Sequence, residues 1–259
     1  MRVTPRVWIG FAVFVGYVAL VIAVQILGGV PFPEWGDNPQ NLFFGPVLSL
    51  LIATVALVAV ISGLGWWGPV LRDRERSRHR WALIAPLVFA VIAIAGLAGA
   101  EWSAVDGAFF AVALLLLLVG FTEEVTTRGV LLVALRSRLA EVWVWLITTS
   151  AFALMHLSNV LLGQDVPATL SQVFSAFMFG NVLYILRRAT GSLVPAMVLH
   201  ALWDFSLFIQ GTGTVAPFAE YVGVLTFPAW ALSLVALIFV IRGTHERVDV
   251  THRTGRSVA

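Results

Sequence analysis

The chain has 259 residues, of which 59% are hydrophobic and only 12% charged, and its mean hydropathy is +0.93. A soluble domain of this length carries about 25% charged residues, so the composition excludes an ordinary water-soluble globule and predicts a surface that faces lipid. The sequence has no cysteine, which excludes disulfides, a thiolate nucleophile and a cysteine metal site. The net charge is +2, and the basic residues lie in short loops between apolar segments, so we expect no nucleic-acid partner.

Apolar stretches long enough to cross a bilayer follow one another along the whole chain. A spanning helix needs about 20 mostly apolar residues. The stretches that qualify are residues 7–29, 43–66, 81–100, 108–133, 142–162, 169–187, 192–210 and 221–242. We therefore predict an all-α, polytopic membrane helix bundle with about eight transmembrane helices. Residues 1–259 form a single transmembrane domain in this prediction, with a basic tail over 243–259.

The charges of the connecting loops separate into two sets. One set contains the basic residues of the N-terminus, of three loops and of the tail, with five arginines in Arg72–Arg80 alone. The charged residues of the opposite loops are all acidic: Glu34, Asp37, Glu101, Asp106, Asp165 and Glu220. Cytoplasmic loops carry an excess of basic residues, so both termini are predicted to be cytoplasmic. The segment Arg72–Arg80 is interpreted as a topology determinant that also faces anionic headgroups.

Six ionisable side chains lie inside the predicted spans. They are Glu123, Glu124, Arg128, His156, His200 and Asp204. A charge at the centre of a span costs at least about 2.5–3.5 kcal/mol on insertion scales, so such residues face the bundle interior. With a rise of about 1.5 Å per residue, three helices bring these groups to a similar depth. We expect one polar cavity that opens toward the arginine-rich side; the alternative is an interhelical salt-bridge network that only holds the bundle together.

Helical spacing separates the roles of these residues. Glu123 and Glu124 are adjacent and point about 100° apart, whereas Glu124 and Arg128 are four residues apart in the order that favours an ion pair. We therefore expect Glu124 and Arg128 to form a supporting pair, which leaves Glu123 as the catalytic candidate. His200 and Asp204 share the same spacing, so both project from one face of their helix.

A carboxylate and two imidazoles at one depth suit amide hydrolysis. A buried carboxylate beside a neutral imidazole can hold and deprotonate a water molecule. A second imidazole, with a nearby aspartate, can stabilise the oxyanion that forms when this water attacks an amide. No Gly-x-Ser-x-Gly motif supports a serine nucleophile. The same side chains could bind zinc, although no His-Glu-x-x-His pair is present. We expect a reaction without metal or other cofactor, with zinc as the alternative.

Three short motifs in chain order resemble a known family. They are Glu123-Glu124-x-x-x-Arg128, Phe152-x-x-x-His156 and His200-x-x-x-Asp204. Each lies on a separate predicted span, and together they resemble the motifs of the CAAX-protease and bacteriocin-processing family, which includes the Rce-type CAAX prenyl endopeptidases. The resemblance covers roughly residues 105–210.

The resemblance implies an eight-helix bundle with an intramembrane cavity and peptidase activity. Carried over to this chain, Glu123 and His156 would activate the water, and His200 with Asp204 would form the oxyanion site. The supporting residues would be Glu124, Arg128 and Phe152. Well-studied members have asparagine where this chain has Asp204. An ionised aspartate cannot donate to an oxyanion, so Asp204 is either protonated or orients His200.

We therefore predict an intramembrane glutamic endopeptidase that cleaves hydrophobic or membrane-associated peptides in a bacterial cell membrane. Its predicted partners are a peptide or protein substrate and the lipid bilayer, and no oligomeric state is predicted. Two other classes compete with this function. One is a catalytically silent immunity or scaffold protein of the same fold, which the complete motif set disfavours. The other is a transporter or proton-relay protein, which the lack of inverted repeats disfavours.

Overall fold

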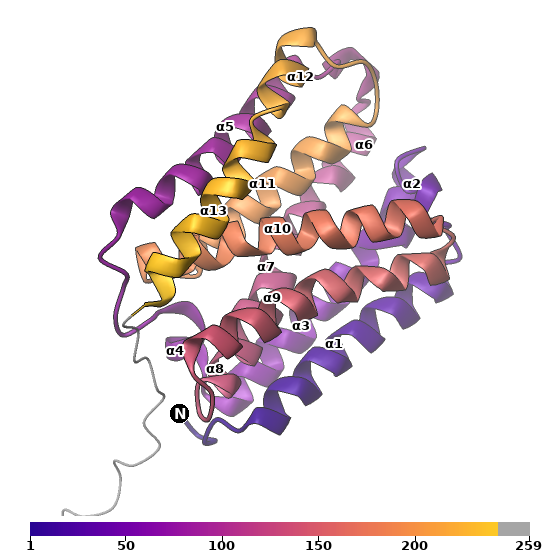
Figure 1. Ribbon diagram of the computed structural model, residues 1–259. Helices are drawn as coiled ribbons and strands as arrows, with labels where there is room; N and C mark the ends of the chain where they lie inside the picture. Colours follow the sequence, from indigo (N-terminus) through magenta and orange to yellow (C-terminus); the bar gives the residue numbers. More distant parts are fainter. Residues whose placement is uncertain (243–259) are drawn as a thin grey trace, which may run out of the picture.

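The computed structural model describes residues 1–242 and folds them into a bundle of helices without strands (Figure 1). The α-helices are α1 (Val7–Gly28), α2 (Pro39–Leu42), α3 (Leu48–Leu64), α4 (Trp67–Leu71), α5 (Ile84–Gly99), α6 (Gly107–Ala113), α7 (Leu118–Glu124), α8 (Leu132–Leu135), α9 (Glu141–Met155), α10 (Val166–Thr190), α11 (Val194–Gln210), α12 (Pro217–Gly223) and α13 (Thr226–Ile241). Short 3-10 helices join them at η1 (Phe32–Glu34), η3 (Arg80–Leu83), η4 (Trp102–Ala104), η5 (Leu114–Leu117) and η7 (His156–Leu162). Two π-helical segments are η2 (Phe43–Val47) and η6 (Val125–Leu131). The predicted all-α fold is confirmed, and the predicted basic tail, 243–259, lies outside the described residues.

Seven helical segments of the described chain are long and apolar enough to cross a membrane. They are Val7–Gly28, Pro39–Leu64, Arg80–Gly99, Gly107–Leu135, Glu141–Leu162, Val166–Thr190 and Pro217–Ile241. The eighth predicted span, 192–210, is the apolar helix α11, whose 17 residues fall short of the roughly 20 needed for a full crossing. It packs inside the bundle against α5, α7 and α10. The chain is thus a multi-pass integral membrane protein, with seven helices of spanning length among residues 1–242.

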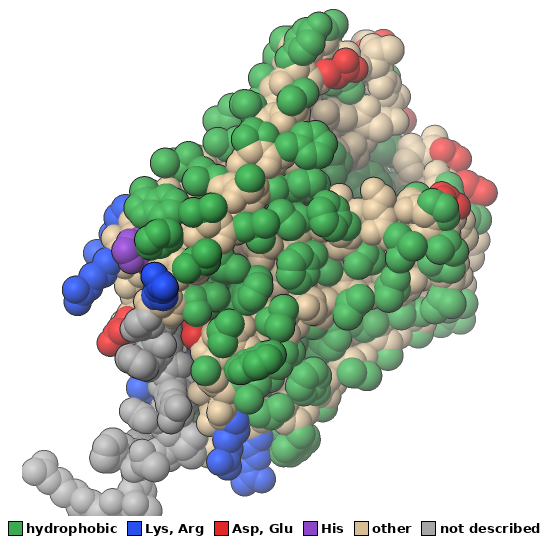
Figure 2. Space-filling model, in the orientation of Figure 1, with side chains coloured by type: hydrophobic (Ala, Val, Ile, Leu, Met, Phe, Trp, Pro, Cys, Tyr) green, Lys and Arg blue, Asp and Glu red, His purple; other side chains and the backbone are tan. Residues whose placement is uncertain are grey.

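The surface of the bundle is divided by residue type. Figure 2 shows hydrophobic side chains over the flank of the molecule, arginines mainly at one end and acidic side chains mainly at the other. Large apolar side chains point outward from several helices, among them Leu27, Val55 and Phe227, which are 85%, 71% and 67% exposed. Such a broad exposed apolar surface needs a covering, and the lipid bilayer supplies it.

Both described chain ends lie at the arginine-rich end of the bundle (Figure 1). The backbone N–H of Arg2 donates to the carbonyl oxygen of Leu64, which joins the N-terminus to the end of α3. Trp81, at the start of the third span, packs its ring against Phe239 near the end of α13, at 5.4 Å between centroids. We call this end the arginine end, and the opposite end, with Glu34 and Asp165, the acidic end. The cytoplasmic location of the arginine end stays a prediction.

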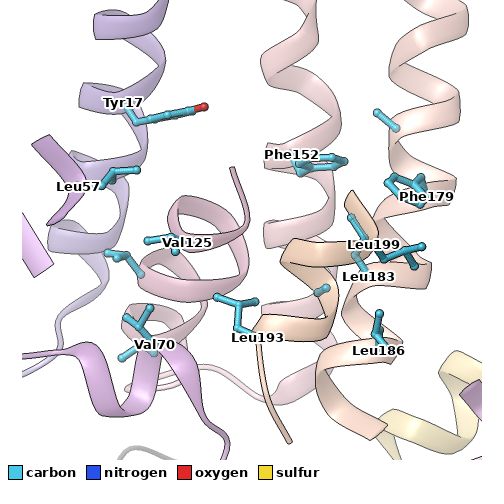
Figure 3. Close-up of a cluster of buried hydrophobic side chains, with 14 of the residues drawn as sticks. Tyr17, Leu57, Val70, Val125, Phe152, Phe179, Leu183, Leu186, Leu193 and Leu199 are labelled. Carbon is cyan, nitrogen blue, oxygen red and sulfur yellow. The ribbon is translucent and has the colours of Figure 1, made fainter. Parts of the chain in front are cut away.

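A buried apolar cluster fills the centre of the bundle and supports the residues of interest. Tyr17, Leu57, Phe152, Phe179 and Leu199 belong to it and come from five different helices (Figure 3). Because these helices are far apart in sequence, the cluster fixes their relative positions through burial of apolar surface.

Close backbone contact sets the position of α7 against α11. Gly120 lies so near the carbonyl oxygen of Met197 that a Cβ atom there would overlap it. Only glycine permits this approach. The following turn of α7 therefore lies directly against α11, which places Glu123 beside His200.

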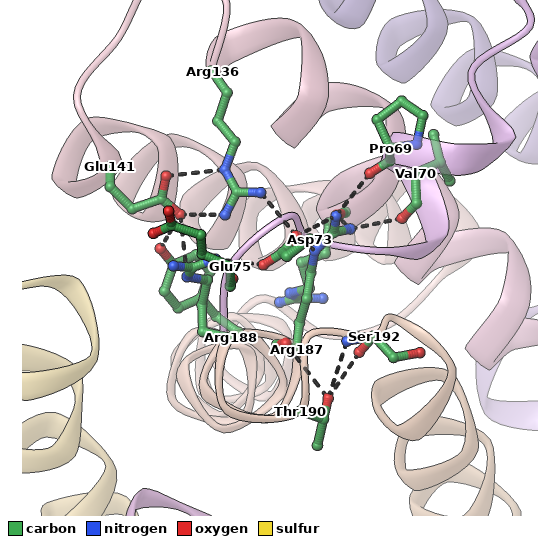
Figure 4. Close-up of polar contacts among 12 residues, drawn as sticks. Pro69, Val70, Asp73, Glu75, Arg136, Glu141, Arg187, Arg188, Thr190 and Ser192 are labelled. Carbon is green, nitrogen blue, oxygen red and sulfur yellow. Dashed lines mark hydrogen bonds and ion pairs between the residues drawn. The ribbon is translucent and has the colours of Figure 1, made fainter. Parts of the chain in front are cut away.

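A cluster of buried charged side chains lies at the arginine end, and we call it the arginine-end ion cluster (Figure 4). It consists of Asp73, Arg136, Glu141, Arg187 and Arg188. Asp73 Oδ1 accepts from Arg136 Nη1 at 2.9 Å and from Arg187 Nη2 at 2.8 Å, and its Oδ2 accepts from Arg188 Nη1 at 2.6 Å. Glu141 accepts from Arg136 at 2.5 Å, and also from the Tyr184 hydroxyl at 2.6 Å.

This cluster adds a packing role to the segment Arg72–Arg80, whose five arginines are exposed and whose role as a topology determinant stays a prediction. Asp73 from that loop has a side chain with no exposed surface, as do Arg187 and Arg188. Burial alone would raise the pKa of Asp73, but attraction by Arg187, Arg136 and Arg188 holds that pKa well below its usual range. The loop is therefore part of the packed structure at the arginine end, because its aspartate pairs with Arg187 and Arg188 in the last turn of α10 and with Arg136 at the end of α8.

Candidate active site

The four predicted catalytic residues come from three parts of the chain, two of which change helix type at the site. Glu123 and Glu124 are the last residues of α7, and the chain continues as the π-helix η6. A π-helical turn is wider than an α-helical one and is common at functional sites. His156 is the first residue of the 3-10 helix η7, and His200 and Asp204 lie on α11.

The structure brings Glu123, His200 and Asp204 together. His200 Nε2 lies 3.8 Å from Glu123 Oε2 and 3.6 Å from Asp204 Oδ2. The side chain of Glu123 is 15% exposed and that of Asp204 is 32% exposed, whereas His200 is buried beneath them. Among residues 1–242, Glu123 Oε2 is a buried oxygen without a hydrogen-bond partner. Such an atom needs a partner that the protein itself does not supply.

The predicted ion pair between Glu124 and Arg128 is present, and both side chains are fully buried. Glu124 has a further contact that its sequence spacing did not indicate, because His200 Nδ1 donates to Glu124 Oε1 at 3.1 Å. This bond fixes the tautomer of His200 and directs its Nε2 toward Glu123 and Asp204. Glu124 therefore connects the supporting pair to the imidazole.

Phe152 lies between the supporting pair and the histidines. The guanidinium carbon of Arg128 lies 4.0 Å from the centre of the Phe152 ring, a cation–π contact. The same ring meets His156 and His200 edge to face, at 5.4 Å between centroids in each case. Phe152 thus keeps the region between Arg128 and the two imidazoles dry and sets the tilt of both rings.

The His156 ring is oriented by a backbone carbonyl of the preceding helical turn. Its Nδ1 lies 2.9 Å from the carbonyl oxygen of Phe152, which can only accept, so Nδ1 carries the proton. In the neutral ring Nε2 then has a free lone pair. His156 lines a cavity, where this nitrogen can accept a hydrogen bond from water.

A cavity of about 150 Å³ joins these residues. Glu123, His156 and Asp204 all line it, whereas His200 lies behind Glu123 and does not. A water molecule occupies about 30 Å³ in the liquid, so the cavity has room for a few. The predicted clustering of the site residues around one polar cavity is therefore present, with His200 in contact with its wall.

The direction of the cavity differs from the prediction. Its lining includes Gln25 in the last turns of α1, together with Phe32 and Trp35 in the loop at the acidic end. On the other side, the segment Val125–Leu135 is buried throughout and fills the bundle toward the arginine end. The cavity thus extends toward the acidic end, because the π-helix and the ion cluster occupy the side where an opening was predicted.

Several cavity residues escaped the sequence analysis. Tyr17 on α1 lines the cavity and donates from its hydroxyl to Thr122 Oγ1 at 3.3 Å. Gln25, Asn159 and Gln172 also line it. The available signal was the presence of uncharged polar side chains inside predicted spans, which is weaker than that of a charge because such side chains cost less to insert.

Among residues 1–242, no three His, Asp or Glu side chains are grouped with the spacing of a metal site. Reaction without a metal stays a prediction, which a chelation experiment can test.

The fold and the site define a class: a multi-pass helical membrane protein with carboxylates and imidazoles gathered around an internal cavity. Residues 105–206 match the family model of the type II CAAX prenyl endopeptidase Rce1-like proteins. This segment contains all four predicted catalytic residues, so the predicted family resemblance is confirmed over it. No curated protein matches the chain.

Proposed function

We propose that the protein is an intramembrane endopeptidase that cleaves hydrophobic or membrane-associated peptides with a water molecule activated by Glu123 and His156. The observation that carries this proposal is the side chain of Glu123, which lines the same cavity as His156 and has a buried oxygen, Oε2, without a hydrogen-bond partner among the described residues. The family match over residues 105–206 supports the same class of reaction.

In this proposal a water molecule binds between Glu123 and His156 Nε2. Its oxygen attacks the carbonyl carbon of the substrate amide while one of its protons moves to Glu123. The electron pair of the C=O double bond moves to the carbonyl oxygen and forms an oxyanion. The C–N bond then breaks, the leaving nitrogen takes the proton from Glu123, and the products are a carboxylic acid and an amine.

His200 stabilises the oxyanion in this scheme. Its Nδ1–H is committed to Glu124, so a second proton on Nε2 makes the ring a cation among three carboxylates. Asp204 Oδ2 lies close to that nitrogen, which favours an orienting role for Asp204 over direct donation to the oxyanion. A preorganised donor of this kind in a dry site contributes strongly to stabilising the transition state.

The test uses purified protein, in detergent and in vesicles, with a panel of hydrophobic peptides whose products are identified by mass spectrometry. Glu123→Gln removes the base but keeps the shape, so the cleavage rate should fall about 10²–10⁴-fold. The control is Glu220→Gln, the same change at an exposed position of the acidic end, which should cleave normally. Absence of cleavage by the unaltered protein would overturn the proposal in favour of a silent scaffold. Ion or proton flux across vesicles without cleavage would favour a transporter.

A further inference from the structure

Two amide side chains in the cavity have no part in the proposed chemistry. Asn159 Nδ2 donates to Gln172 Oε1 at 2.8 Å, which joins η7 to α10. This bond leaves Asn159 Oδ1 as an acceptor and Gln172 Nε2 as a donor, and neither has a partner among residues 1–242. Both residues line the same cavity as Glu123 and His156. The cavity wall therefore presents one acceptor and one donor side by side.

The 3-10 geometry of η7 fixes where this pair lies relative to the reaction. In a 3-10 helix the side chains at positions i and i+3 are eclipsed, and the rise is about 2.0 Å per residue. Asn159 is three residues after His156 within His156–Leu162, so it lies on the same face, about 6 Å further toward the acidic end. Gln172 reaches the same point from the neighbouring helix.

An acceptor beside a donor is the complement of a peptide main chain. Each residue of an extended chain offers one N–H and one C=O group, and partners for both bind it without regard to its side chain. The distance of about 6 Å corresponds to about two residues of an extended strand, which rises about 3.3 Å per residue.

We infer that Asn159 and Gln172 form a main-chain binding subsite that holds an extended peptide substrate about two residues from the bond that is cleaved. The inference rests on the proposed peptidase function and names the form of its substrate. A peptide in a helix has its N–H and C=O groups already paired, so a helical substrate must unwind before this subsite can bind it. Recognition at this point is independent of side-chain sequence.

The alternative role for the amide pair is purely structural, as a hydrogen bond between η7 and α10. A structural bond would affect stability and all substrates equally. A subsite instead interacts with one particular peptide unit of the substrate. The two roles are therefore separated by altering single peptide units.

The experiment uses a peptide that the unaltered protein cleaves, prepared as a series in which one amide at a time, other than the scissile one, is replaced by an ester. An ester lacks the N–H and has a weaker acceptor. We expect kcat/KM to fall about tenfold at one position about two residues from the cleaved bond, and much less at other positions. This part needs no variant, so it does not depend on the folding of altered protein.

The same series is then measured with Asn159→Leu and Gln172→Leu. Each variant should cleave the all-amide peptide about tenfold less efficiently and should lose the additional sensitivity to the ester at that one position. Gln40→Leu is the matched control, because Gln40 is exposed and outside the cavity, and it should give the unaltered pattern. Equal sensitivity at all positions, or variants that keep the full ester effect, would overturn the subsite while leaving the peptidase intact. Failure of the unaltered protein to cleave any peptide would overturn the peptidase and the subsite together.

Discussion

Two groups of buried charges lie in this bundle, and they are built differently. In the arginine-end ion cluster both oxygens of Asp73 are bonded, to three arginines, and these side chains are almost fully buried. In the group around His200, Glu123 Oε2 has no bonded partner among the described residues, and Glu123, His156 and Asp204 face a cavity. Both carboxylate oxygens of Asp73 thus have hydrogen-bond partners, whereas one carboxylate oxygen of Glu123 has none among the described residues.

This difference indicates which buried carboxylate stabilises the fold and which one can take part in a reaction. A carboxylate whose oxygens are all bonded to guanidinium groups has no capacity to take up a proton or bind a water molecule. A carboxylate with a free oxygen beside a cavity carries a cost in stability, and such costs are found at functional sites. Glu124 differs from both: Arg128 and His200 hold its Oε1, its Oε2 is buried without a hydrogen-bond partner among the described residues, and its side chain does not line the cavity.

The largest effect on stability is expected for Arg128→Ala. Removing this guanidinium strands the buried carboxylate of Glu124 and should lower the free energy of unfolding by about 3–5 kcal/mol. The measurement is the yield and thermal midpoint of monodisperse protein in detergent. Arg138→Ala is the matched control, because Arg138 is exposed, and it should behave as the unaltered protein does. Normal accumulation of Arg128→Ala would show that the pair does not support the fold.

A smaller effect is expected from acid on the arginine-end ion cluster. The pKa of Asp73 is lowered in the folded protein, so its contribution to stability is fully present above the unfolded value near 4 and decreases as the pH falls below that value. The thermal midpoints of the unaltered protein and of Asp73→Asn should therefore differ by a constant amount well above about pH 4, and this difference should shrink steadily as the pH is lowered below that value. A difference that stays constant over this range would contradict the structural role of the Asp73 charge.

No effect is expected from removal of metal ions. If Glu123 activates water directly, cleavage should survive extensive dialysis against chelators, and elemental analysis should find no stoichiometric metal. Cleavage lost on chelation and restored by zinc would contradict this prediction. Glu123 would then be reassigned as a metal ligand or as the base for a metal-bound water.

The sequence was sufficient for the fold because each span must be long and apolar, and this requirement is visible residue by residue. It was also sufficient for contacts within one helix, such as Glu124–Arg128, because the helical period fixes which side chains are neighbours. The contact of Glu124 with His200 joins residues 76 positions apart, and only the packing of α7 on α11 creates it.

Other features depended on local geometry that the apolar pattern does not encode. Asp73 lies among alternating charges, which is typical of a solvated loop, yet three arginines from other segments bury it. Asn159 lies directly beyond His156 because η7 is a 3-10 helix, and no residue in the motif indicated that change of helix type. The direction of the cavity likewise followed from the buried π-helix, which was predicted as ordinary α-helix.

The central claim is that the carboxylate of Glu123 takes part in the reaction, whereas that of Asp73 stabilises the fold. A comparison of Glu123→Gln with Asp73→Asn, each measured for both properties, tests this claim most directly. Both changes replace one buried oxygen by an amide nitrogen, and both are measured for thermal midpoint and for cleavage rate per folded molecule. We predict that Glu123→Gln keeps the midpoint and loses cleavage, while Asp73→Asn lowers the midpoint and keeps the cleavage rate of its folded fraction. Folded Glu123→Gln that cleaves at the unaltered rate, or folded Asp73→Asn that is inactive, would contradict the claim.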